Sequence, residues 1–315
     1  MTVDQDASPA ARASRRRVDG VEVLGAISPS RAADFMTCPL MFRFRTVDRL
    51  PETSSVDAMR GTLVHKVLED LFSLPAADRT PETARAMLVP TWERFLTDDP
   101  TLLAMFEDVE AAHEPGFLEW MRSAAEVLDR YFTLEDPRRL EPAERELYVE
   151  ALLESKLLLR GFIDRVDVAP DGAIRLSDYK TGYSPGETYE AKALFQMKFY
   201  ALVVWRMRGV VPRQLQLIYL GNGEILRYEP DEADLLATER KVNALWAAIR
   251  EADELREWQP QRSRACDWCS FREICPAWGG TPPPVPPRRS LTPDASRPTG
   301  PRWFARLRRW WRRPR

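Results

Sequence analysis

Asp164, Asp178 and Lys180 lie in the stretch GFIDRVDVAPDGAIRLSDYKTG, residues 161–182, in a pattern that can hold a divalent cation. The Pro-Asp-Gly turn at 170–172 separates two strand-like runs and predicts a hairpin. Because side chains alternate along a strand, Asp178 and Lys180 should share one face, and Asp164 should share another with Phe162 and Val166. Carboxylates about 4 Å apart repel by roughly 4 kcal/mol at an effective dielectric constant near 20.

Mg²⁺ or Mn²⁺ between the carboxylates would remove this repulsion, because both ions prefer oxygen ligands. A lysine beside such a cation can orient or deprotonate water that attacks a phosphate. The alternative interpretation is a surface hairpin with an ordinary Asp–Lys ion pair. The matching positions of Asp164 and Asp178 favour the metal site over this alternative.

The long pattern G-x-I-D-R followed by D-Y-K-T-G resembles the RecB-like exonuclease branch of the PD-(D/E)xK nuclease superfamily. The resemblance extends over roughly residues 26–278 and implies an α/β restriction-endonuclease-like core, a mixed central sheet flanked by helices. It implies that Asp164, Asp178 and the Tyr179 carbonyl bind the metal. It also implies that Lys180 is the catalytic base or the group that orients the water.

One of the two histidines lies in the helical pattern GTLVHKVLEDLF, residues 61–72, beside its apolar stripe. Such a histidine is more often a packed core residue than a ligand. The segment G-x-x-x-H-x-x-L-E is nevertheless similar to the RecB-like helix that gives an imidazole to the metal, which implies that His65 is a ligand. Glu69, one turn later, could orient that imidazole.

Two further polar patterns are less specific. Gln196 and Tyr200 lie on one face of a helix predicted over residues 188–207, and an ordinary packing helix is the alternative. The resemblance implies that this Q-x-x-x-Y pair contacts DNA near the scissile phosphate. Strand-like alternation over residues 144–156 includes Glu150, which we expect to be solvated rather than part of the site.

The four cysteines, Cys38, Cys266, Cys269 and Cys275, have a three-plus-one spacing, C-x₂-C-x₅-C with one distant partner. Zinc ribbons usually pair two short C-x₂-C motifs, whereas four thiolates also suit an iron–sulfur cluster. Zinc and unrelated structural cysteines remain alternatives. The resemblance implies a [4Fe–4S] cluster that ties the two ends of the nuclease core together.

Composition divides the chain further. We expect a disordered leader over residues 1–25, a helical insertion over about 81–135, an Fe–S region over 258–278 and a Pro-rich linker over 279–301. Residues 302–315 form a tail with seven arginines interleaved with aromatic residues, which could bind DNA or a membrane surface. The remaining residues carry 39 basic against 48 acidic side chains, so nucleic-acid contacts should be local.

Together with the resemblance, these patterns favour a metal-dependent exonuclease that acts on single-stranded DNA ends in repair or recombination. A structure-specific endonuclease, a DNA-binding subunit of a helicase–nuclease complex and a redox or iron-sensing regulator are the alternatives. The sequence has no P-loop motif, so any helicase would be a separate protein. A cytoplasmic location with no membrane span is expected, because the sequence shows no signal peptide and no long apolar run.

Overall fold

The computed structural model describes residues 17–52, 55–106, 116–184 and 187–286. Its centre is a six-stranded mixed sheet of β3 (Gly25–Ile27), β4 (Glu144–Leu152), β5 (Leu157–Val168), β6 (Ile174–Lys180), β7 (Gln214–Tyr219) and β8 (Glu224–Tyr228). The order is β3-β5-β6-β7-β8, and β4 also pairs with β5. The β3–β5 and β6–β7 pairs are parallel and the other pairs are antiparallel.

Helices cover both faces of the sheet. They are α1 (Pro29–Thr37), α2 (Pro39–Phe42), the π-helix Arg43–Asp48, α3 (Val56–Leu71), α4 (Pro81–Ala86), α5 (Leu88–Asp98), α7 (Phe117–Leu134), α8 (Glu187–Arg208) and α9 (Glu232–Leu255). Short 3₁₀ turns span Ala76–Asp78, Pro100–Phe106, Pro137–Arg139, Arg264–Trp268, Arg272–Ile274 and Pro276–Trp278. The predicted α/β architecture, a mixed sheet flanked by helices, is confirmed.

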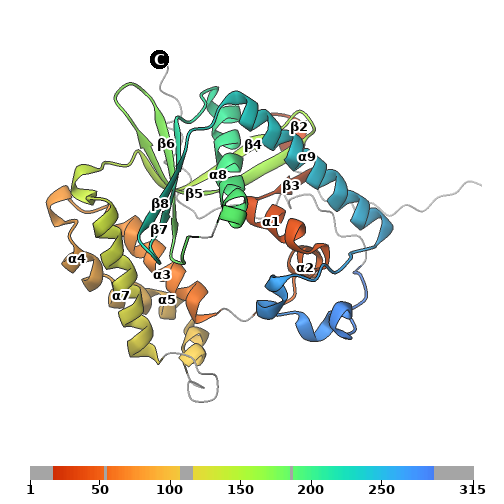
Figure 1. Cartoon of the computed structure of the whole chain (residues 1–315), viewed down its shortest axis with the longest axis horizontal. Coiled ribbons are helices and arrows are strands. Elements are labelled where there is room, and N and C mark those ends of the chain that lie inside the picture. The colour runs from red at the N-terminus through yellow and green to blue at the C-terminus, as the bar shows by residue number, and fades with distance from the viewer. Residues whose placement is uncertain (1–16, 53–54, 107–115, 185–186, 287–315) are drawn as a thin grey trace, which may run out of the picture.

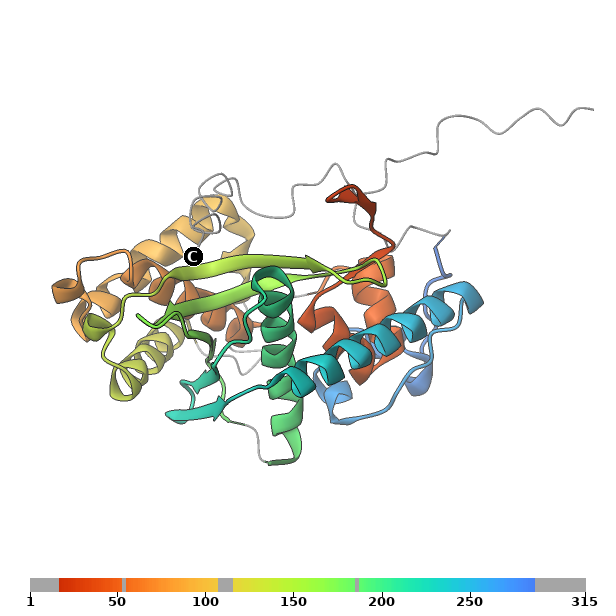
Figure 2. The same ribbon diagram turned by 90° about the horizontal axis from the view of Figure 1, so that it is seen from above.

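Two hydrophobic clusters form the core. One joins α1, α2, α8 and α9 to the sheet, and the other joins α3, α4, α5 and α7 to it. Figure 1 shows the second group of helices gathered at one end of the molecule, while α1, α2 and the blue C-terminal segment lie at the other. Figure 2, turned by 90°, shows α8 crossing the sheet between these two groups.

The chain becomes ordered earlier than the sequence predicted. Residues 17–25, assigned to a disordered leader, include β1 (Arg17–Val18), β2 (Val21–Glu22) and the start of β3. Asp19 and Gly20 both have positive φ, as a two-residue hairpin turn requires. The prediction was wrong here because Val23 is fully buried in a small cluster with Ala26 and Leu158. Residues 1–16 and the predicted tail, 302–315, lie outside the described residues.

The sheet leaves part of one strand edge open near its centre. On one edge of β5, residues 157–159 pair with β3 and residues 165–168 pair with β6. Residues 160–164, which include Asp164, lie between these two pairings. In the described part of the chain no helix has the length and apolar character that crossing a membrane would need.

Candidate metal centre

The first predicted ligands meet where β5 passes α3. His65 Nδ1 lies 3.4 Å from Asp164 Oδ2. The same Asp164 oxygen accepts a hydrogen bond of 2.7 Å from the Tyr179 backbone N–H. Because Tyr179 follows Asp178 in β6, this bond joins the two strands that carry the carboxylates. The structure therefore brings His65, Asp164 and the Asp178–Tyr179 segment together.

The second carboxylate forms a closed polar triangle with β6 and α8. Lys180 Nζ lies 2.6 Å from Asp178 Oδ2 and donates a 2.9 Å hydrogen bond to Gln196 Oε1. The Gln196 amide in turn donates to Asp178 Oδ1 at 2.9 Å. Although it contacts Lys180, Asp178 Oδ2 has no partner with hydrogen-bond geometry among the described residues. Gln196 thus fixes the relative position of Asp178 and Lys180. The sequence analysis did not assign this role to Gln196.

Tyr200, the other residue of the Q-x-x-x-Y pattern, is largely buried. Its side chain is 7% exposed and belongs to the hydrophobic cluster of α8. A Cβ placed on Gly161 would lie 2.6 Å from Tyr200 Cε1, so the glycine allows the close approach of α8 to β5. Burial, followed by the charge of Asp178, raises the pKa of Tyr200 and keeps its hydroxyl neutral.

Sequence reasoning missed a third carboxylate, Glu146 of β4. One ligand atom from each of His65, Glu146 and Asp164 lies within 4.8 Å of the others. Glu146 has a φ of +44°, and the β4–β5 register passes from Arg145 to Leu147 without a partner for it. No feature of the pattern ERELYV signals this left-handed residue, because the alternation on either side is regular.

Glu150, the acidic residue of the same strand that the sequence predicts to be solvated, accepts a 2.6 Å hydrogen bond from the Tyr148 hydroxyl. Glu150 pairs opposite Arg160, further along β4 than Glu146. It is therefore not one of the ligands grouped with His65 and Asp164.

The predicted alternation of β5 also fails around Asp164. Phe162 is 37% exposed, whereas Val166, expected on the same face, is 3% exposed. Ile163 and Val166 belong to one hydrophobic cluster although three positions separate them, which regular alternation would not allow. The alternation changes where the β4–β5 pairing omits Glu146 and Asp164, although the register is the same on either side of this interruption.

The charges of the cluster explain why a cation suits it. Burial, then the charges of Asp178 and Glu146, raise the pKa of Asp164 well above its ordinary value. Burial and neighbouring carboxylates also raise the pKa of Glu146 to about 7, and burial lowers the pKa of His65. A metal ion would stabilise the charged carboxylates and the neutral imidazole at once. This mixed set of one imidazole and carboxylate oxygens fits Mg²⁺ or Mn²⁺.

The model of the PD-(D/E)XK nuclease superfamily matches residues 26–276. The chain belongs to this superfamily. The Gene 69 protein of Mycobacterium phage D29 is 26% identical to this nuclease over 207 residues, 58% of this chain and 70% of the phage protein. The crystal structure named "Putative exonuclease" from Eubacterium rectale matches with a TM-score of 0.50 and 14% identity, over 78% of this chain and 87% of that one. That likeness concerns the fold.

Membership establishes the coarse chemistry. Nucleases of this superfamily hydrolyse phosphodiester bonds and use divalent metals. In this member, the His65–Glu146–Asp164 group is the site where the described residues could hold such an ion.

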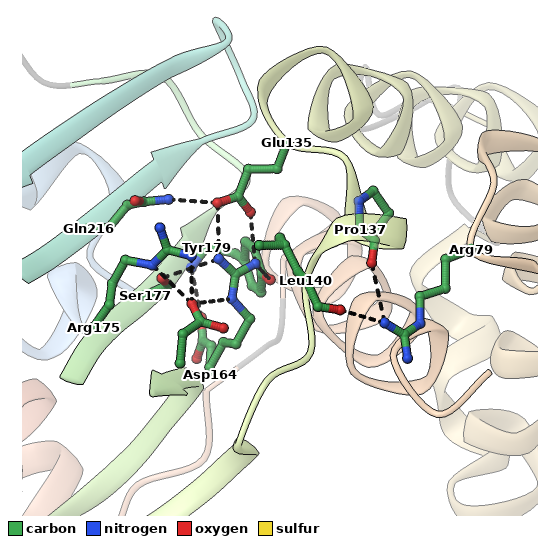
Figure 3. A network of polar contacts seen from close by, with 11 residues as sticks. Arg79, Glu135, Pro137, Leu140, Asp164, Arg175, Ser177, Tyr179 and Gln216 are labelled. Atoms are coloured by element: carbon green, nitrogen blue, oxygen red, sulfur yellow. Dashed lines mark hydrogen bonds and ion pairs between the residues drawn. The ribbon is translucent and has the colours of Figure 1, made fainter. Parts of the chain in front are cut away.

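A buried polar network supports the nuclease site from behind (Figure 3). Arg165 is fully buried and forms a two-pronged ion pair with Glu135, with N···O distances of 2.7 and 3.0 Å. Its guanidinium also donates to the Tyr179 hydroxyl at 2.8 Å and to Asp167 at 3.1 Å. Gln216 of β7 donates to Glu135 at 2.9 Å. The network therefore links the residue after α7 to the two strands that carry the aspartates.

The four cysteines of the nuclease line one cavity, together with apolar side chains that include Phe44 and Phe271. All four are free thiols of intermediate exposure. The backbone N–H of Gln261 donates to Cys38 Sγ at 3.4 Å, and that of Ser263 donates to Cys266 Sγ at 3.5 Å. In the described segments, which contain every cysteine, no three sulfurs lie within 4.8 Å of one another.

Proposed function

We propose that the chain is a metal-dependent DNA exonuclease of the RecB-like branch that hydrolyses phosphodiester bonds at single-stranded ends. The observation that carries this proposal is the placement of Lys180, 2.6 Å from Asp178 and hydrogen-bonded to Gln196, beside the His65–Asp164 pair. A lysine held next to a carboxylate metal site is suited to position water for attack on phosphorus.

The proposed roles follow from these contacts. His65, Glu146, Asp164, Asp178 and the Tyr179 carbonyl would hold the cation, which supplies Lewis-acid polarisation of the phosphate when bound. Lys180 orients the attacking water, and Gln196 keeps the ammonium in place from α8. The Gln196 amide forms hydrogen bonds with both Asp178 and Lys180. Its contact with DNA would therefore be limited to the scissile phosphate. Tyr200 would support this region mainly by packing against Gly161.

End-labelled linear single strands and circular single strands of equal length, each with Mg²⁺ or Mn²⁺, test the activity. Loss of the linear strand with survival of the circle supports an exonuclease. Cutting of the circle favours the endonuclease alternative, and binding without cutting favours a DNA-binding subunit. The Eubacterium rectale protein's name is in keeping with the first outcome. The proposal also includes a role in DNA repair or recombination, a separate helicase as a partner and a cytoplasmic location.

Two variants test the site itself. Asp178→Asn removes one ligand charge and should lower the cutting rate at least about 10²-fold, equivalent to ~2.7 kcal/mol of barrier. Lys180→Ala should abolish cutting while calorimetry still detects Mn²⁺ binding. Asp57→Asn, at a side chain that is 75% exposed on α3, is the matched control. Wild-type cutting by both site variants would show that the proposed active site is wrong.

We also propose that Cys38, Cys266, Cys269 and Cys275 hold a [4Fe–4S] cluster. Their shared cavity, the N–H groups aimed at two sulfurs and the apolar lining support it. Tetrahedral zinc with Zn–S bonds of about 2.3 Å would need all its sulfurs roughly 3.8 Å apart, whereas no three of the described cysteine sulfurs lie within 4.8 Å of one another. The cluster would staple the N-terminal end of α2 to the segment after α9.

Anaerobic purification tests the cluster. The protein should be brown and contain iron and acid-labile sulfide at about four atoms of each per chain. Cys266→Ser should bleach it and reduce thermal stability, because metal binding contributes to folding. Colourless protein with stoichiometric zinc and no iron would overturn the proposal.

A further inference from the structure

An open groove of about 680 Å³ begins at the metal centre and continues away from it. Its walls come from α3, α5, β4 and β5. It is lined by Gly61, Thr62, His65, Lys66, Glu69, Phe95, Glu146 and Phe162. His65 and Glu146 are members of the metal cluster, so whatever occupies the groove lies next to the reacting phosphate.

Phe162 presents an aromatic ring to this groove. It is 37% exposed, although its strand neighbours Gly161 and Ile163 face the protein interior. The ring is supported from behind by Tyr148, its cross-strand partner, at a centroid distance of 5.3 Å. Phe95 contributes a second, half-buried ring from α5. An exposed ring that is held in place beside a catalytic centre is a stacking surface rather than part of the core.

The charges of the groove select against a phosphate chain. The ammonium of Lys66 is already paired with Glu69 at 2.8 Å and Asp70 at 2.9 Å. Glu69 and Glu146 add carboxylates to the lining, so the groove offers rings and acids rather than a free cation. A neutral, flat group fits these walls, and each nucleobase has a π face that an aromatic side chain can stack against.

We propose that this groove is a subsite for one unstacked nucleobase of the substrate strand, with Phe162 as the stacking platform. The inference rests on the proposed function, because it takes the scissile phosphate to lie at the metal centre. A base inside a duplex is stacked on both faces and paired with the opposite strand, so it could not enter the groove without leaving the helix. The subsite therefore selects single-stranded or frayed ends.

Binding measurements in a Lys180→Ala background, which should hold Mg²⁺ without cutting, test the subsite. Adding Phe162→Ala should weaken binding of a labelled single-stranded oligonucleotide at least about fivefold, since base–aromatic stacking contributes on that scale. Phe162→Trp should retain affinity, and Phe162→Leu should lose it although it stays apolar. Leu118→Ala, at an 81% exposed side chain on α7, is the control for loss of exposed apolar surface.

An abasic-site scan distinguishes stacking from a general effect on the fold. One position in the oligonucleotide should weaken binding to the Lys180→Ala parent when its base is removed, and that loss should vanish in the Phe162→Ala double variant. Unchanged binding by Phe162→Ala, or equal abasic losses in both proteins at every position, would overturn the subsite. Active wild-type protein with such results leaves the proposed function standing. Wild-type protein that neither binds nor cuts DNA would overturn both.

Discussion

The buried Arg165–Glu135 pair gives a quantitative test of how the site is held. Glu135→Gln keeps the size of the side chain and removes the charge that faces a guanidinium with 1% side-chain exposure. Removing one partner of a buried pair typically costs about 3–5 kcal/mol. Asp167 remains 3.1 Å from Arg165 Nε, which places the expected cost at the lower end, about 3 kcal/mol. For a domain of this size each kcal/mol moves Tm by about 2–4 °C, so Tm should fall by roughly 6–12 °C.

Thermal unfolding followed by circular dichroism, at pH 7 and again in acid, measures this effect. Burial opposes ionisation of Glu135, but the hydrogen bonds and charge of Arg165 outweigh it and lower the pKa of Glu135 below 4.5. The stabilisation is therefore complete above pH 4.5 and disappears as the pH falls through the lowered folded-state pKa. Wild type and Glu135→Gln should differ at pH 7 and converge in strong acid.

Glu141→Gln is the matched control, because Glu141 also pairs with an arginine but its side chain is 77% exposed. It should change stability by no more than about 1 kcal/mol. A Glu135→Gln protein that melts within 2 °C of wild type, a shift of about 1 kcal/mol or less, would refute the claim that this pair holds the hairpin in place.

Two further predictions concern the metal and the packing of α8. Because the pKa of Glu146 is raised to about 7, its contribution to the stability of the metal-free protein falls as pH rises from 4.5 through 7. Mg²⁺ should therefore raise Tm more at pH 8 than at pH 6, and Glu146→Gln should shrink that difference; equal increments in wild type would contradict this. Gly161→Ala should cost about 1–3 kcal/mol in urea unfolding because its Cβ meets Tyr200, whereas Gly182→Ala, with no described atom within 4 Å of the added Cβ, should stay near wild type.

The parts of the site that could be predicted are those with a local pattern. The 161–182 hairpin, the helix of His65 and the helix of Gln196 each have a period or turn that a sequence reveals. The prediction missed Glu146 because its position depends on a positive φ and on an interruption of the β4–β5 pairing, which side-chain alternation cannot show. It missed Glu135 because the residue follows a helix and meets Arg165 only in three dimensions, 30 positions along the chain.

The contacts of the hairpin explain why both groups of helices are needed for one site. Asp178 and Lys180 face α8, where Gln196 fixes their relative position. Tyr179, between them, faces the opposite way and its hydroxyl meets the Arg165–Glu135 network.

The backbone N–H of Tyr179 also holds the Asp164 carboxylate that lies beside His65. A single residue thus transmits the position of the helices on one face of the sheet to the ligands of the metal. Displacement of either group of helices should therefore disturb the distance between Asp164 and Asp178, and with it the affinity for the cation, before the sheet itself unfolds.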